Sequence, residues 1–125
     1  MKPYVDGTEQ LVVEIHVRDI ERSRDFLETF GFDVIRDEGD FIELKWEHSR
    51  LFLEQLHGAP APPADPIANL RVMVPNVDDY WARAQKLGAR IVRPIEDRYY
   101  GLRDFTIAGP DGLALRFATR LNDVK

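Results

Sequence analysis

The sequence predicts an α+β fold built from two βαβββ modules in tandem. Two observations carry this prediction: a pattern of apolar residues that occurs twice, and a proline-rich segment between its copies. The apolar pattern of residues 12–32 is repeated at 69–89. A pattern that is repeated at a fixed offset indicates a repeated supersecondary unit. The matched pairs all differ by 57 in number: Ile15 and Val72, Phe30 and Leu87, Gly31 and Gly88. Two copies predict a pseudo-symmetric domain with a curved, incompletely closed mixed sheet and an open cleft.

The first module is expected over residues 10–56. From Leu11 the chain alternates, with Ile15 on one face of a strand and Glu14 and His16 on the other. Asp19 caps a helix predicted over 20–30, which a glycine at 31 ends. A second strand is expected over 32–36, followed by a turn at 38–40.

The next hairpin can be registered from the sequence. A two-residue turn at Glu47-His48 pairs Trp46 with Ser49 and Leu44 with Leu51, which merges the apolar residues of both strands on one face. The opposite face of this hairpin then collects Phe41, Glu43, Lys45, Phe52 and Glu54.

The segment 57–66 holds four of the eight prolines and is predicted to be a stiff linker inside a single domain, 1–125. The second module, over 67–120, repeats the plan. Its first strand contains Val72 and Val74, and a strand over 91–95 follows its helix. A last hairpin, 102–108 and 113–119, surrounds a turn at 109–112. The helix stripe is Val77, Trp81, Ala84 and Leu87, and the core residues of the last strand are Leu113, Leu115 and Phe117.

Composition excludes several classes of function. The net charge of −5 argues against a nucleic-acid partner, and no apolar run is long enough to span a membrane. The absence of cysteine excludes disulfides and thiolate metal sites. Residues 1–9 are polar and lack the apolar core of a secretion signal, so they are interpreted as an arm, and the protein is expected to be cytoplasmic.

Each predicted module leaves one face of its sheet without a helix, and an unusual set of side chains gathers there. A curved sheet lined by polar and aromatic residues makes a concave binding site. The candidate residues on this face are Glu14, His16, Phe41, Glu43, Phe52, Glu54, Asn69, Arg71 and Arg116.

Three features together resemble the vicinal oxygen chelate superfamily, which includes glyoxalase I, extradiol dioxygenases and bleomycin-resistance proteins. They are the paired modules, a V-x-D-I-x-x-S-x-x-F stretch at 17–26, and a closing GPDG-x-x-L-R-F hairpin at 109–117. The resemblance covers about residues 11–120 and is nearest to the bleomycin-resistance group. The chain departs from that group at Leu27, where a tyrosine is usual, and at Gly109, where an aspartate is usual.

The resemblance also implies where a metal would lie. Enzymes of the superfamily hold one divalent metal at positions that match Val12, Glu54, Asn69 and Arg116. Valine has no donor atom and arginine is a permanent cation, so no metal or other cofactor is expected. A displaced site of Glu14, His16 and Glu54 remains open, as does an ion pair of Glu54 with Arg116 or Arg71.

The resemblance favours a non-catalytic protein that sequesters a cationic or planar aromatic small molecule in a cleft at the interface of a homodimer. Tyr99 and Tyr100 resemble an aromatic pair that borders this cleft in bleomycin-resistance-like members. Two alternatives stay open. One is a metal-dependent enzyme of the glyoxalase or dioxygenase type, and the other is a binder of a ligand unrelated to antibiotics.

Overall fold

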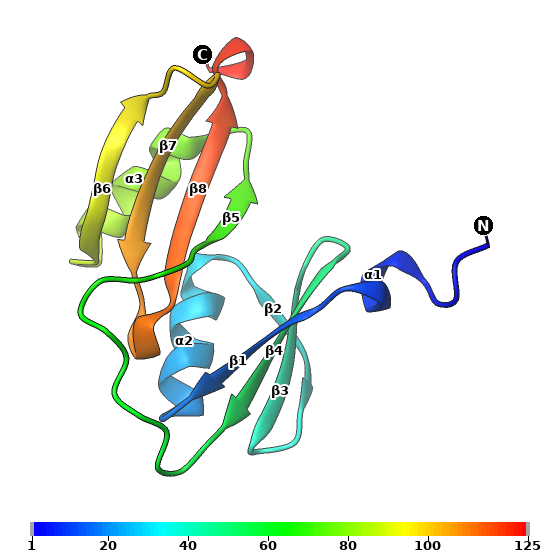
Figure 1. Cartoon of the computed structure of the whole chain (residues 1–125). Helices are drawn as coiled ribbons and strands as arrows, with labels where there is room; N and C mark the ends of the chain where they lie inside the picture. Colours follow the sequence, from blue (N-terminus) through cyan, green and yellow to red (C-terminus); the bar gives the residue numbers. More distant parts are fainter. Residues whose placement is uncertain (1, 125) are drawn as a thin grey trace. The chain divides into compact units, whose positions relative to one another are not determined.

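The computed structural model describes residues 2–124, and the chain divides into two compact units, 1–61 and 62–125. The boundary between the units falls inside the segment 57–66. Each unit contains one four-stranded sheet and one long helix (Figure 1). The first unit contains α1 (Gly7–Gln10), β1 (Val13–Val17), α2 (Ile20–Phe30), β2 (Asp33–Asp37), β3 (Phe41–Trp46) and β4 (Ser49–Gln55).

The second unit repeats this order without a counterpart of α1. It contains β5 (Leu70–Met73), α3 (Val77–Lys86), β6 (Arg90–Asp97), β7 (Leu102–Ala108), the 3-10 turn η1 (Pro110–Gly112), β8 (Ala114–Arg120) and η2 (Leu121–Asp123). The predicted fold class, α+β with tandem βαβββ modules, is therefore confirmed. The short helix α1 was not predicted: it forms where the sequence indicated only an arm, near the turn between β3 and β4.

Both sheets have the same topology, with strand orders β1-β4-β3-β2 and β5-β8-β7-β6. The first and last strands of each module are parallel neighbours, while the other pairs are antiparallel. The predicted register of the β3–β4 hairpin is confirmed, because Trp46 pairs with Ser49 and Leu44 with Leu51. This register fixes which side chains share the open face of the first sheet.

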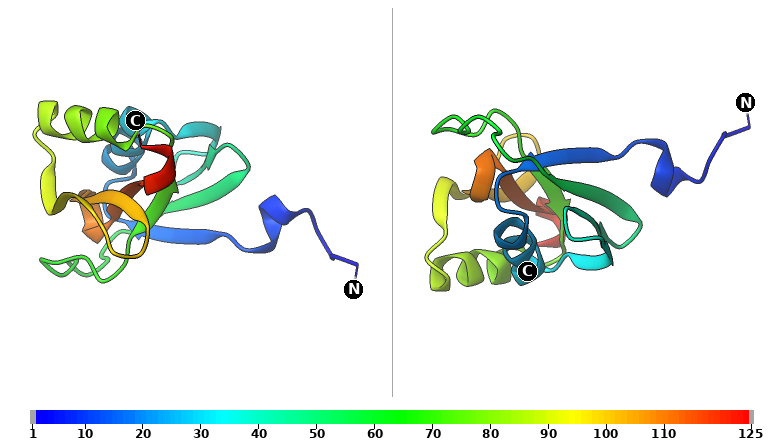
Figure 2. Two further views of the ribbon diagram at one scale, coloured as in Figure 1. Left: turned by 90° about the horizontal axis from the view of Figure 1, so that it is seen from above. Right: turned by 90° about the horizontal axis from the view of Figure 1, so that it is seen from below.

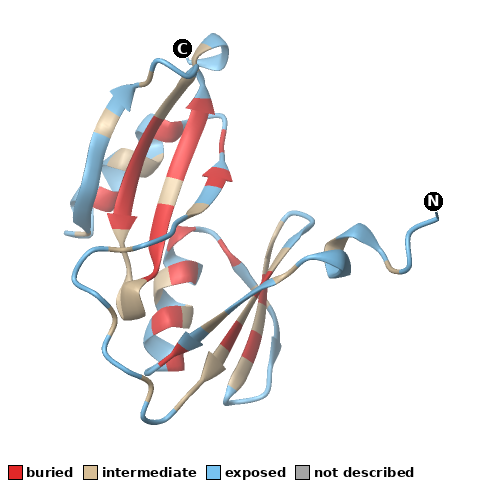
Figure 3. Cartoon of the chain, viewed as in Figure 1, coloured by how far each residue is buried: buried red, intermediate tan, exposed pale blue. Residues whose placement is uncertain are grey.

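One helix covers one face of each sheet, as Figure 2 shows for α3 and the second sheet. The buried side of α2 carries Ile20, Leu27 and Phe30, and the buried residues alternate with exposed ones along the helix (Figure 3). In the second unit, Val77 and Ala84 of α3 are buried, as are Phe105 and Phe117 on the sheet.

Leu87 was predicted to lie in the core stripe of α3, and this prediction is wrong. The helix ends at Lys86, so Leu87 is the C-cap residue and its side chain is 53% exposed. Its counterpart Phe30 is still inside α2 and is buried. The difference of one residue in helix length therefore changes the environment of an otherwise matched position.

In each module, a side chain from the last strand forms hydrogen bonds with the backbone at the start of the helix. In the first module, the backbone N–H of Ile20 donates to Gln55 Oε1 at 2.8 Å, and Gln55 Nε2 donates to the carbonyl of Arg18. In the second module, Thr119 Oγ1 accepts from the backbone N–H of Val77 at 2.9 Å and donates to Val74 O at 2.7 Å. These bonds satisfy backbone groups that a helix leaves without partners at its N-terminus.

Glycine ends both helices, but in different surroundings. Gly31 has φ of +119°, and the ring of Trp46 lies so close that a Cβ at this position would be 2.8 Å from Trp46 Cζ3. Trp46 in turn packs edge-on against Phe32, with ring centroids 5.2 Å apart. Gly88 has φ of +68°, and a Cβ added to Gly88 would have no atom within 4 Å.

Among the helices formed by residues 2–124, none has the length and the apolar character needed to cross a membrane.

Candidate functional site

The open face of the first sheet brings together five of the predicted site residues. Strand register places His16 beside Glu54 and Glu14 beside Phe52 across the parallel β1–β4 pair. It also places Phe41 beside Glu54 across β3–β4. Because alternate residues of a strand share a face, these side chains form one patch, which we call the acidic-aromatic patch: Glu14, His16, Phe41, Phe52 and Glu54.

The aromatic half of this patch is a pair of half-buried rings. The Phe41 and Phe52 ring centroids are 5.2 Å apart, with the rings tilted by 58°. The guanidinium carbon of Arg36 lies 5.0 Å from the Phe41 centroid. This cation–π contact shows that the face of the Phe41 ring attracts positive charge.

The acidic half of the patch has an unusual charge balance. His16 Nε2 lies 3.8 Å from Glu14 Oε2 and 4.0 Å from Glu54 Oε2. The hydrogen bond between the two carboxyl groups raises the pKa of Glu54, with smaller contributions in the same direction from desolvation and the charge of Glu14, while His16 opposes them. Within the described residues of the first unit, 2–61, no lysine or arginine forms an ion pair with either glutamate.

Glu43, on the same face of the sheet, has a different environment. Its carboxylate is paired with Arg36 at 3.5 Å and with Arg50 at 3.7 Å. The cationic residues of this face therefore neutralise Glu43 and leave Glu14 and Glu54 to share a single histidine.

In the second module, Arg116 is held by an aspartate that the sequence reasoning missed. Arg116 Nη2 and Nε donate to Asp104 Oδ2 at 2.6 and 3.0 Å. Arg116 therefore has a carboxylate partner inside its own module, and its pairing with Glu54 of the first module stays a prediction. Strand alternation could have found this partner, since Asp104 pairs with Ala118, two residues from Arg116 on the same face.

Asp104 is the centre of a buried network with two further donors. Arg98 Nε donates to Asp104 Oδ1 at 2.8 Å, and the Tyr100 hydroxyl donates to Oδ2 at 2.7 Å. Burial alone would raise the pKa of Asp104, but the hydrogen bonds from Arg98, Tyr100 and Arg116 lower it below its ordinary value. The carboxylate thus remains ionised and fixes the direction of Arg116.

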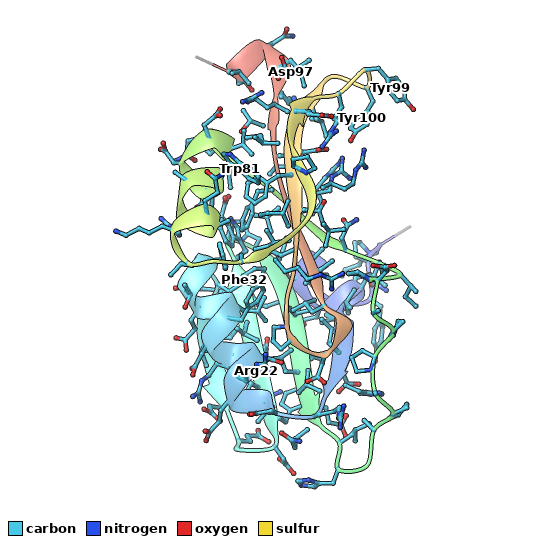
Figure 4. The ribbon with its side chains drawn as sticks, turned by 90° about the vertical axis from the view of Figure 1, so that its left-hand side faces the viewer. Arg22, Phe32, Trp81, Asp97, Tyr99 and Tyr100 are labelled. Atoms are coloured by element: carbon cyan, nitrogen blue, oxygen red, sulfur yellow. The ribbon has the colours of Figure 1, made fainter. Side chains whose placement is uncertain are left out.

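Tyr99 and Tyr100 lie in the loop between β6 and β7, and Tyr99 points outward (Figure 4). Their ring centroids are 5.2 Å apart in an edge-on arrangement, and the Arg116 guanidinium carbon lies 5.5 Å from the Tyr100 centroid. Tyr99 is fully exposed, whereas Tyr100 is anchored through its hydroxyl to Asp104. The pair therefore offers one free ring and one fixed ring.

The last two predicted residues belong to the start of the second sheet. Arg71 pairs with Arg116 across β5–β8, and Asn69 immediately precedes β5; both are exposed. The predicted site residues thus divide between the two modules. The first contributes the acidic-aromatic patch, and the second contributes Asn69, Arg71, Tyr99 and Arg116.

The four positions implied by family resemblance do not fit a shared metal ion. Val12 offers no donor atom, and Arg116 is a cation already bonded to Asp104. Asn69 is a weak oxygen donor, which leaves Glu54 as the only strong ligand, whereas a catalytic transition metal requires about three protein ligands. No chemistry through a metal at these four positions follows from the structure.

Comparison with known proteins identifies the family. A model of the Glyoxalase/Bleomycin resistance protein/Dioxygenase superfamily matches residues 10–117. Among solved structures, TioX from Micromonospora sp. ML1 is 25% identical, with a TM-score of 0.72 over 89% of this chain and 98% of that one. No curated protein sequence matches the chain.

Two further structures share the fold at lower identity. A bleomycin-binding protein complexed with bleomycin is 18% identical, with a TM-score of 0.69 over 90% of this chain and 99% of that chain. A glyoxalase/dioxygenase from Nostoc punctiforme is 15% identical, with a TM-score of 0.77 over 96% and 98% of the respective chains. Since the family model spans nearly the whole repeat, this protein belongs to the Glyoxalase/Bleomycin resistance protein/Dioxygenase superfamily.

Proposed function

We propose that this protein is a non-catalytic small-molecule binder of the bleomycin-resistance type, which sequesters a cationic or planar aromatic ligand. The observation that carries the proposal is the acidic-aromatic patch. In it, Glu14 and Glu54 lie close together without a lysine or arginine partner among the described residues of the first unit, and two phenylalanine rings lie beside them.

The chemistry of the patch suits a ligand that combines positive charge with a flat ring. A cation placed between the carboxylates offsets the negative charge of Glu14, which is one of the contributions that raise the pKa of Glu54. An aromatic group packs against the Phe41 and Phe52 rings and gains from ring stacking as well as from removal of apolar surface from water. The two halves of the patch thus recognise the two halves of such a ligand.

The same evidence favours binding over catalysis. The positions that resemble the superfamily's metal ligands lack the donors that metal-dependent glyoxalase or dioxygenase chemistry needs, as Val12 and Arg116 illustrate. The shared fold of the bleomycin-binding protein supports a drug-type ligand as the first candidate, although the similarity of 18% identity reaches only the fold.

A charge-removing variant tests this proposal. Glu54→Gln is expected to weaken the binding of an aromatic cation about threefold to tenfold, because a partly exposed charged contact is lost. Glu43→Gln is the matched control, since that carboxylate lies on the same face but is already paired with Arg36 and Arg50. Calorimetric titration with bleomycin and with benzyltrimethylammonium measures both variants against the wild type.

Each outcome of this titration has a clear meaning. Binding that weakens in Glu54→Gln and persists in Glu43→Gln supports the patch as the ligand site. Equal binding by all three proteins places the site elsewhere, and the absence of binding of either compound to the wild type removes drug sequestration as the function.

The proposal includes a homodimer that completes the ligand cleft. Apolar side chains at the start of the chain, Tyr4 and Leu11, are almost fully exposed, and β1 is an edge strand with one unpaired side. An isologous contact would cover both features. Light scattering is expected to give twice the mass of one chain, and deletion of residues 1–9 is expected to shift the equilibrium toward monomer. A single-chain mass at every concentration would exclude the dimer.

A further inference from the structure

Three side chains with metal-binding chemistry converge on the first sheet. Glu14 and His16 are alternate residues of β1, and Glu54 lies beside His16 on β4. One ligand atom from each residue can be chosen so that all three lie within 4.8 Å of one another. Two paired strands hold these residues, so their separation is fixed by backbone register and does not depend on a loop.

The charges of this triad leave room for a positive ion. The carboxylates of Glu14 and Glu54 lie close together, and His16 is the only basic side chain of the described first unit, 2–61, that pairs with them. Glu43 on the same face shows that arginine is available nearby, yet Arg36 and Arg50 both pair with Glu43. A divalent cation between Glu14 and Glu54 would attract both carboxylates and so offset the repulsion between them.

The distances fit coordination after a small adjustment. Ligand atoms that bind one first-row metal at about 2.0–2.2 Å lie roughly 3.0–3.5 Å from each other. The His16 nitrogen is 3.8 and 4.0 Å from the two carboxylate oxygens, slightly wider than this range. The side chains of His16, Glu14 and Glu54 are 54%, 38% and 41% exposed, so their torsions can close the gap without disturbing the core.

We propose that Glu14, His16 and Glu54 bind one divalent first-row transition metal ion, such as zinc, entirely within the first module. An imidazole nitrogen with two carboxylates favours such an ion over calcium or magnesium, which prefer oxygen ligands alone. This site is separate from the four positions implied by family resemblance, with which it shares only Glu54. It also goes beyond the proposed function, because the occupant is an inorganic ion that the His16 imidazole and the two carboxylates bind directly.

Another histidine of the chain supplies a matched control for the test. Untagged full-length protein is freed of metal with a chelator and titrated with zinc in a calorimeter, alongside His16→Ala and His48→Ala. His48 lies in the exposed turn between β3 and β4, outside the triad. The wild type and His48→Ala are expected to bind one zinc ion per chain.

His16→Ala is expected to bind zinc at least about tenfold more weakly, because even an indirect partner of a metal ligand contributes about that much to affinity. Cobalt in place of zinc gives a second readout, since its visible spectrum reports nitrogen and oxygen coordination. No zinc binding by the wild type, or equal binding by wild type and His16→Ala, would overturn the proposal. Titration of the metal-free wild type with benzyltrimethylammonium separates this proposal from the proposed function, because binding of the organic cation does not require the metal.

Discussion

Asp104→Ala is expected to lower the free energy of unfolding by about 3–5 kcal/mol, the range seen when one partner of a buried ion pair is removed. The Asp104 side chain is 1% exposed and accepts hydrogen bonds from Arg98, Tyr100 and Arg116. Its removal leaves the Arg98 guanidinium, on a side chain 9% exposed, without its main counter-ion. Urea-induced unfolding at neutral pH measures the loss.

Two further variants sharpen this prediction. Asp104→Asn keeps an oxygen acceptor and is expected to lose less stability than the alanine variant. Asp123→Ala, at an exposed aspartate of the same module, is expected to unfold like the wild type. A loss below about 1 kcal/mol in Asp104→Ala would mean that water screens the network as it screens a surface ion pair.

The same carboxylate predicts a dependence of stability on pH. Burial would raise the pKa of Asp104, but its three donors lower it more, so the pKa lies below the ordinary 3.8. A group with a lowered pKa in the folded state stabilises the protein above its ordinary pKa, and this contribution disappears as the pH falls through the lower folded value. The difference in unfolding free energy between wild type and Asp104→Ala should therefore shrink as the pH falls below 3.8.

Gly31→Ala is expected to destabilise the protein by about 2–4 kcal/mol, because backbone strain and a steric clash add. Gly31 has φ of +119°, and a Cβ there would lie 2.8 and 2.9 Å from two atoms of the Trp46 ring. The ring must move, and its edge-on contact with Phe32 would be disturbed. Urea unfolding followed by tryptophan fluorescence reports both the stability and the environment of Trp46.

Gly88→Ala is the matched control at the equivalent position of the second module. Its φ of +68° imposes the left-handed conformation, but nothing lies within 4 Å of the added carbon. It is expected to cost about 1–2 kcal/mol from backbone strain alone. Equal losses of unfolding free energy in Gly31→Ala and Gly88→Ala would show that the Trp46 ring moves away from the added carbon without a cost in stability.

The sequence predicts the first half of each module well because local signals agree there. Asp19 and Gly31 mark the ends of α2 correctly, and the repeat at an offset of 57 residues places the start of the second helix at Val77, where α3 begins. The repeat weakens beyond β6: β3 starts at Phe41 and β7 at Leu102, an offset of 61. The β6–β7 ladder also contains register shifts, which a periodic pattern does not reveal.

The candidate site is only partly accessible to sequence reasoning. Alternation within β1, β3 and β4 correctly assembles the acidic-aromatic patch, since short hairpins fix which residues share a face. Asp104 was missed because two of its donors, Arg98 and Tyr100, come from a loop whose path no periodicity specifies. A carboxylate beside core residues such as Phe105 and Ile107 of the same strand is the signal that should prompt a search for such donors.

The bonds from Gln55 and Thr119 to the helix starts constrain the order in which the protein folds. Gln55 lies 35 residues after Ile20, and Thr119 lies 42 residues after Val77. The first residue of neither helix gains these hydrogen bonds until the last strand of its own module has docked, so the start of each helix becomes ordered together with that strand. Such long-range closure slows folding but makes it cooperative. During synthesis, the first module can therefore complete its structure once β4 has left the ribosome, before the second module has been made.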